Sequence, residues 1–88
     1  MKILYADEFK SQFKKLPKPI QRIYLRQENI FRNNWRDSRL HVKKLIENTI
    51  TFSFRITRNY RVIFVFSDTD TALFLTIGHR KDIYRKHT

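Results

Sequence analysis

The sequence of 88 residues contains no cysteine, a single glycine and two prolines. The absence of cysteine excludes disulfides, thiolate metal sites and a cysteine nucleophile. One glycine cannot form a glycine-rich phosphate loop, and the G-x-S-x-G motif of serine hydrolases is also missing. The scarcity of glycine and proline indicates compact elements joined by short connections.

Acidic residues are also scarce. Eight Asp and Glu stand against nineteen Lys and Arg, which gives a formal net charge of +11. Residues 1–44 carry 12 basic and 4 acidic side chains, and residues 45–88 carry 7 and 4, so the excess is not one short localisation signal. A field of this kind attracts polyanions, above all nucleic acid or the ribosome. An acidic protein partner and simple solubility are the alternatives.

Long hydrophobic runs are absent. No stretch approaches the about 18 apolar residues of a membrane span, and Asp7 and Glu8 interrupt the N-terminal region before a signal-like segment develops. The composition is nevertheless 41% hydrophobic and 15% aromatic, which is too apolar for a disordered basic tail. We therefore expect one folded domain over residues 1–88, located in the cytoplasm and not in a membrane.

The first half of the chain predicts a strand and two helices. Residues 2–6 form a short apolar run typical of an opening strand. Phe9, Phe13 and Leu16, spaced i, i+4 and i+7, predict a helix that begins at Asp7 and is stopped by Pro17. A second helix is expected from Pro19 to about Asn33. The polar segment 34–48 predicts no regular element.

The second half predicts an antiparallel β-meander. Apolar and polar residues alternate over 49–57, residues 60–66 are almost continuously apolar, and a third strand over 72–77 follows the turn-forming run 67–70. The expected fold class is α+β, with the N-terminal strand and helical hairpin packed on this meander. A short C-terminal helix or tail completes it.

The first hairpin of the meander has a predictable register. A three-residue loop at Thr57–Asn59, with Asn59 in the left-handed conformation, pairs Phe54 with Val62 and keeps the alternating apolar residues on one face. A two-residue loop would scramble the faces. The favoured register sets Arg55 directly opposite Arg61.

Two arginines facing each other across a strand pair repel by some tenths of a kcal/mol, up to about 1 kcal/mol. One interpretation is that an anion such as a phosphate sits between Arg55 and Arg61. The other is that Glu47 or an aspartate neutralises them, or that both side chains turn into water.

The last predicted strand leads into Gly78, where glycine would permit an unusual turn, and then into His79, Arg80 and Tyr84. Pairing of the last two strands would bring this segment near Arg61. The chain shows no metal-ligand spacing among its histidines and no paired carboxylates, which leaves metal-free phosphodiester chemistry. In RNA the 2′-OH can attack its own phosphate when a base takes its proton and cations stabilise the added charge. His79 or Tyr84 would handle the proton, although a lone histidine near a terminus is more often a surface residue.

Residues 52–84 resemble the second half of RelE-family toxins, in the hairpin around Arg55 and Tyr60-Arg61-Val62 and in the terminal I-G-H-R-x-x-x-Y. The resemblance implies metal-free, cofactor-free endoribonuclease activity on mRNA, on the ribosome in many members, which inhibits translation. By position it assigns Arg55 to the scissile phosphate region, Arg61 to the transition state and Arg80 to leaving-group protonation. Tyr84 is assigned as general base or stacking platform. Further RNA-binding residues are expected at Lys43, Lys44, Arg58, Lys81 and Arg85.

The sequence departs from the family pattern in three places. Ser53 stands where some members have a second basic residue, and His79 stands where others have lysine, so proton transfer would shift to His79. The spacing from Gly78 to Tyr84 is shorter than in some members. Lys43 and Lys44 would supply the missing charge.

Two other functions compete with RNA cleavage. ParE-like members of the same superfamily share the fold but poison DNA gyrase, and a degenerate member would be a non-catalytic RNA- or ribosome-binding module. If the protein is a toxin of either kind, its expected partner is a cognate antitoxin. This antitoxin would be acidic or would carry an acidic and apolar segment that covers the basic surface. Whether it would cap the site or displace the Tyr84 segment stays open.

Overall fold

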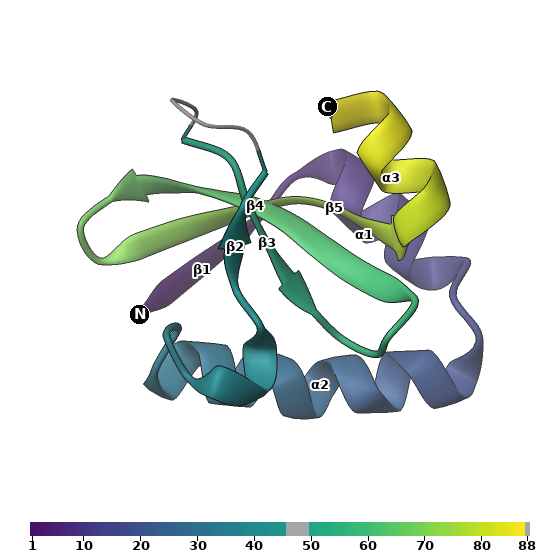
Figure 1. Cartoon of the computed structure of the whole chain (residues 1–88), viewed down its shortest axis with the longest axis horizontal. Helices are drawn as coiled ribbons and strands as arrows, with labels where there is room; N and C mark the ends of the chain where they lie inside the picture. The colour runs from purple at the N-terminus through teal and green to yellow at the C-terminus, as the bar shows by residue number, and fades with distance from the viewer. Residues whose placement is uncertain (46–49, 88) are drawn as a thin grey trace.

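The computed structural model describes residues 1–45 and 50–87, with side chains described up to Ile83 in the last helix. Figure 1 shows the arrangement of the elements along the chain. In order they are β1 (Lys2–Tyr5), α1 (Asp7–Lys14), α2 (Lys18–Asn33), the 3-10 helix η1 (Ser38–Leu40), β2 (Lys43–Lys44), β3 (Phe52–Arg55), β4 (Tyr60–Asp68), β5 (Thr71–His79) and α3 (Arg80–His87).

The helical hairpin has the predicted limits to within a few residues. Asp7 and Glu8 occupy the first turn of α1, where carboxylates complement the helix dipole. Pro17 is the N-cap of α2 and a proline lies in its first turn, so the chain leaves one helix and enters the next over three residues. The end of α2 at Asn33 is confirmed.

One five-stranded mixed sheet has the order β1-β5-β4-β3-β2. The predicted antiparallel meander of β3, β4 and β5 is confirmed, and the opening strand β1 joins it in parallel beside β5. The predicted strand over 49–57 is shorter in the structure, at Phe52–Arg55, and residue 49 lies outside the described residues. Segment 34–48, for which no element was expected, contains η1 and β2.

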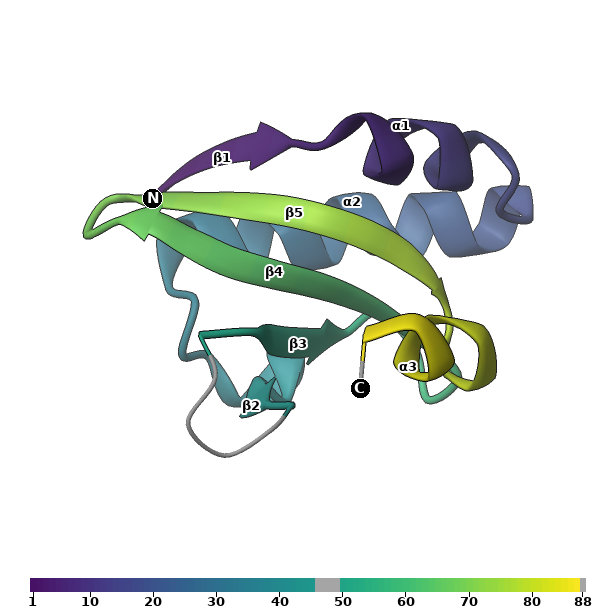
Figure 2. The same ribbon diagram turned by 90° about the horizontal axis from the view of Figure 1, so that it is seen from above.

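Aromatic side chains fill the space between α2 and the sheet. The Phe31 ring lies with its centroid 5.2, 5.0 and 5.1 Å from those of Phe54, Phe64 and Phe74, and all four side chains are fully buried. Rings at these separations contribute beyond the area they bury. Figures 1 and 2 together show α2 against one face of the sheet and α3 over the opposite face. The aromatic core therefore lies on the α2 face of the sheet, opposite the face that α3 covers.

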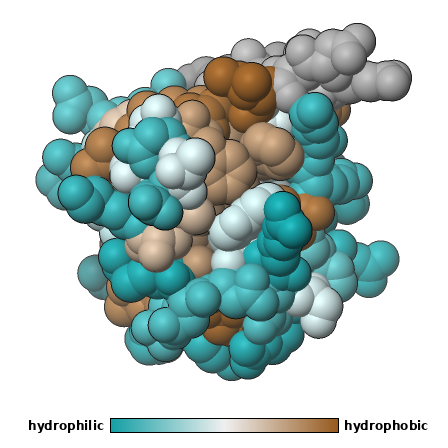
Figure 3. Space-filling view, turned by 90° about the vertical axis from the view of Figure 1, so that its left-hand side faces the viewer, coloured by the Kyte–Doolittle hydropathy of each residue, from teal (hydrophilic) through white to brown (hydrophobic). Residues whose placement is uncertain are grey.

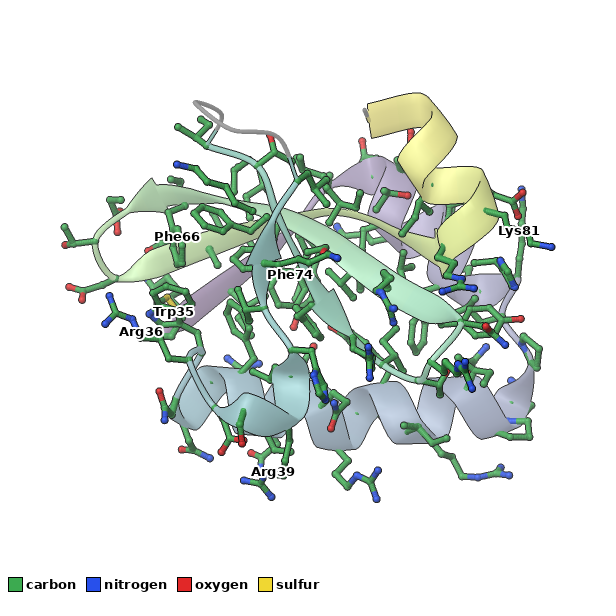
Figure 4. All side chains as sticks on the ribbon, in the orientation of Figure 1. Trp35, Arg36, Arg39, Phe66, Phe74 and Lys81 are labelled. Atoms are coloured by element: carbon green, nitrogen blue, oxygen red, sulfur yellow. The ribbon has the colours of Figure 1, made fainter. Side chains whose placement is uncertain are left out.

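At the other end of the sheet, Trp35 packs against Phe66 with ring centroids 4.9 Å apart, and Arg36 lies over the Trp35 ring (Figure 4). This side of the molecule shows a continuous apolar area bordered by hydrophilic residues (Figure 3). None of the described helices is long and apolar enough to cross a membrane.

Candidate anion-binding and catalytic site

The predicted register of the first hairpin is confirmed. Phe54 pairs with Val62, and Arg55 pairs with Arg61. The predicted left-handed Asn59 is wrong: His41 is the one non-glycine residue of the described chain with a positive φ. The loop closes differently, because the backbone N–H of Asn59 donates to the Thr57 hydroxyl at 3.3 Å.

The side chains of Arg55 and Arg61 line a cleft of about 340 Å³. The Arg61 guanidinium donates to the Thr57 carbonyl at 2.7 Å, which fixes the direction of this side chain. The Nε of Arg55 is buried and has no hydrogen-bond partner in the described chain. A buried donor without a partner is costly and marks a place where an unseen group would bind. This space, called the arginine cleft below, is lined by His41, Val42, Lys43, Ser53, Arg55 and Arg61.

The wall opposite the arginine pair comes from the segment between α2 and β3. Gln27 of α2 is buried, and its Nε2 donates to the carbonyls of Arg39 at 3.1 Å and Arg55 at 2.9 Å. It therefore ties η1 to β3 across the back of the cleft. Leu40 is fully buried and anchors η1 in the core.

Charge in the arginine cleft is of one sign among the described lining residues, which include three permanent cations and no carboxylate. The nearby Asp37 is engaged elsewhere, since it accepts from the Arg39 side chain at 3.0 and 2.8 Å and from its backbone N–H at 2.9 Å. These hydrogen bonds lower the pKa of the Asp37 carboxyl to about 2. Glu47, the alternative neutralising group, lies outside the described residues.

His79 lines a second cleft, of about 300 Å³, where the end of α1 approaches β5 and α3. Its ring contacts Tyr60 edge-on at 5.5 Å between centroids, and its Nδ1 accepts the backbone N–H of Lys81 at 3.2 Å. Tyr60 pairs with His79 while Arg61 pairs with Gly78. Because side chains alternate across a strand, His79 and Arg61 point to opposite faces. The structure does not bring the His79 side chain into the arginine cleft.

The other predicted site residues are spread around this end of the sheet. Arg80 begins α3, is exposed, and its backbone N–H donates to the Asn59 carbonyl at 2.8 Å, which places it beside the β3–β4 loop. Lys43 lines the arginine cleft, whereas Lys44 follows it on the other face of β2. Arg58 and Lys81 are exposed, and Tyr84 and Arg85 belong to α3 with side chains outside the described part.

Gly78 has a role different from the one predicted. Its φ is not positive, so no unusual turn requires it. A Cβ at this position would lie 2.9 Å from Cγ2 of Ile83. Glycine therefore lets α3 pack closely on β5.

Sequence patterns missed three residues that line the arginine cleft, His41, Val42 and Ser53, and also the buried Gln27 that joins η1 to β3. The segment around His41 has no apolar period, so its position depends on contacts distant in sequence. One sequence feature could have indicated that His41 belongs to the cleft: it lies two residues before the Lys43-Lys44 pair, which was predicted to bind RNA.

No family model and no curated protein is significantly similar to the sequence. Among solved structures, the RelB–RelE antitoxin–toxin complex from Methanococcus jannaschii contains a chain 26% identical, with a TM-score of 0.74 over 92% of this chain and 94% of that one. The toxin–antitoxin complex RelBE2 from Mycobacterium tuberculosis gives 26% identity and a TM-score of 0.67 over 90% and 96%. YafQ from E. coli, at 14% identity and a TM-score of 0.75 over 92% and 94%, agrees in fold.

The helical hairpin, the five-stranded sheet and the short last helix define a RelE-like α+β fold. Two of these toxin chains, at 26% identity over 90% or more of this chain, support the resemblance of residues 52–84 to the RelE/ParE toxin superfamily. The similarity supports a toxin role.

Proposed function

We propose that this chain is the toxin of a type II toxin–antitoxin system and a metal-free endoribonuclease that cleaves mRNA. The observation that carries the proposal is the Arg55–Arg61 pair with the unpartnered Nε of Arg55. Two guanidinium groups facing each other are unfavourable in the free protein. A phosphodiester between them would satisfy the buried donor and relieve the repulsion.

The arginine cleft suits the charge change of RNA cleavage. Attack of the 2′-OH on the adjacent phosphorus places additional negative charge on the phosphoryl oxygens. Arg61 is held by its hydrogen bond to the Thr57 carbonyl, so it is already oriented before the substrate arrives. Preorganised cations stabilise such a transition state without reorganising. Lys43 would hold the neighbouring phosphate.

The segment that begins α3 supplies the leaving-group side in this proposal. Arg80 lies beside the β3–β4 loop, within the same end of the sheet as Arg61. By family resemblance Arg80 assists the departing 5′-oxygen, and Tyr84 serves as base or as a platform for an unpaired base. Arg58, Lys81 and Arg85 extend the basic surface towards the ribosome or the RNA strand.

An antitoxin with an acidic and apolar segment is the proposed partner. The net charge of +11 favours such a segment over a basic one. Related chains were crystallised in antitoxin–toxin complexes. Saturating the protein with this partner should protect RNA. Unchanged cleavage by the saturated complex would show that the partner leaves the cleft open.

The direct test compares the wild type with Arg61→Ala on naked RNA and on translating ribosomes. Loss of the oriented guanidinium should lower cleavage by about 10²–10³-fold, as expected for one preorganised transition-state donor. Arg22→Ala removes the same charge from an exposed position of α2 and should cleave like the wild type. Circular dichroism checks that both variants fold.

The same experiment separates the competing functions. Intact RNA together with inhibited gyrase supercoiling would identify a ParE-like gyrase poison. Intact RNA and unaffected gyrase, with retained binding to RNA or ribosomes, would identify a non-catalytic binding module.

A further inference from the structure

His41, which lines the arginine cleft, is held in an unusual backbone conformation. It is the C-cap of η1 with φ 48° and ψ 49°, in the left-handed region, and its N–H donates to the Ser38 carbonyl at 3.2 Å. No other non-glycine residue of the described chain has a positive φ. Such a conformation persists only where the surrounding structure imposes it, and often at a functional site.

Three neighbouring interactions hold His41 in this left-handed conformation. The neighbouring Leu40 is fully buried, Asp37 clasps Arg39 through three hydrogen bonds, and Gln27 holds the Arg39 carbonyl. Because Gln27 also holds the Arg55 carbonyl, the same side chain fixes His41 relative to the arginine pair. The imidazole is exposed and lines the cleft together with Arg55 and Arg61.

The described groups that line the arginine cleft offer one natural proton acceptor. Arg55, Arg61 and Lys43 are permanent cations near neutral pH, and the Ser53 hydroxyl is buried. Histidine is the side chain whose charge changes near physiological pH. The charged groups facing His41 are those three cations and, on its other side, Arg26 and Arg39.

We infer that His41 is the general base of the proposed RNA cleavage, a role that rests on the proposed function and that His79 cannot take from the opposite face. The imidazole nitrogen accepts the 2′-OH proton as the 2′-oxygen forms its bond to phosphorus. The bond from phosphorus to the 5′-oxygen breaks, and that oxygen takes a proton from water. The products are a 2′,3′-cyclic phosphate and a 5′-hydroxyl, and the imidazolium returns its proton to solvent.

The test uses variants that respect the left-handed backbone. His41→Asn keeps the local conformation, since asparagine tolerates positive φ, but cannot accept the proton. We expect it to bind an uncleavable 2′-O-methyl RNA like the wild type and to cleave about 10²–10⁴-fold more slowly. The rise of the wild-type rate with pH through the histidine range should disappear in this variant. His41→Gly should regain cleavage when free imidazole is added.

The competing variant is His79→Asn, which should cleave RNA like the wild type if His41 is the base. If His41→Asn cleaves RNA at the wild-type rate and with the wild-type pH profile, the inference about His41 is wrong, while the proposed function still stands. A loss of cleavage confined to His79→Asn would contradict the inference in the same way. A wild type that leaves RNA intact, both free and on ribosomes, would overturn the proposed function and this inference together.

Discussion

Gly78 of β5 and Ile83 of α3 are in such close contact that a Cβ on residue 78 would lie 2.9 Å from Cγ2 of the isoleucine. Ile83 is 5% exposed and buries α3 against the sheet, whereas the three residues before it in the helix are exposed. The attachment of the helix that carries Arg80 and Tyr84 therefore depends on the absence of one methyl group on β5.

Gly78→Ala should displace Ile83 and destabilise the fold by about 1–3 kcal/mol, the usual cost of overpacking. The measurement is urea unfolding, with limited proteolysis to follow release of α3. In an Ile83→Ala background, where Cγ2 is gone, the added methyl group should cost much less. An equal cost in both backgrounds would mean that the contact does not control the packing of α3.

The arginine pair predicts an exchange of stability for binding. Arg55→Met removes the repulsion with Arg61 and the unpartnered Nε. The free energy of unfolding of the variant should therefore be up to about 1 kcal/mol higher than that of the wild type. For a domain of this size that is about 4–8 °C in melting temperature.

Inorganic phosphate should change the difference in melting temperature between the wild type and Arg55→Met in favour of the wild type. It should raise the melting temperature of the wild type, because a ligand that binds the folded state stabilises it, and leave Arg55→Met unchanged. Arg22→Met on the exposed side of α2 is the control and should respond like the wild type. Equal phosphate stabilisation of Arg55→Met would show that the anion binds elsewhere.

The arginine pair could be predicted from sequence because strand periodicity and loop length leave one alignment that keeps Phe54 and Val62 on the same face. The position of His79 near Arg61 was predicted correctly for the backbone. The direction of its side chain was not, although the same alternation implies it once Tyr60 is paired with His79.

The opposite wall of the arginine cleft could not be predicted. Segment 34–48 has no apolar period, and its path depends on Leu40 entering the core and on Gln27, distant in sequence, binding two backbone carbonyls. A side chain that satisfies carbonyls from two segments leaves no pattern in either of them. His41 was therefore considered only for metal spacing, and its place beside the arginine pair emerged from the structure.

The phenol of Tyr24 predicts an alkaline limit to stability. Burial first, and then the hydrogen bond that its hydroxyl donates to the Glu28 carboxylate, raise the pKa of Tyr24 well above the ordinary tyrosine value of 10.0. A group whose pKa is raised in the folded state contributes stability that is fully present below its pKa in the unfolded chain. This contribution is lost as the pH rises from the unfolded pKa through the folded one. Stability should thus fall above about pH 10.

Tyr24→Phe removes that dependence on pH. At neutral pH the variant should lose about 1.5–3 kcal/mol, the net worth of a hydrogen bond to a charged group. Above pH 10 its stability should decline less steeply than that of the wild type, and tyrosinate absorbance should show one fewer tyrosine that ionises only on unfolding. A decline of the same steepness in both proteins would assign the alkaline transition to other groups.

Gln27 and Gln21 form a matched pair that separates positioning from stability. Each side-chain amide donates to two backbone carbonyls: Gln27 to Arg39 and Arg55, and Gln21 to Phe13 and Leu16. Methionine at either position removes both side-chain hydrogen bonds and should cost about 1–3 kcal/mol in urea unfolding. At position 21 the Phe13 carbonyl keeps its hydrogen bond from the backbone N–H of Leu16, at 3.1 Å. Only Gln27→Met loosens the wall that carries His41, so it should lower RNA cleavage well below wild type under conditions where both variants are folded. Because Gln21 joins α1 to α2 away from the cleft, Gln21→Met should keep wild-type cleavage. Equal losses of cleavage in the two variants would show that the effect follows stability and not the geometry of the cleft.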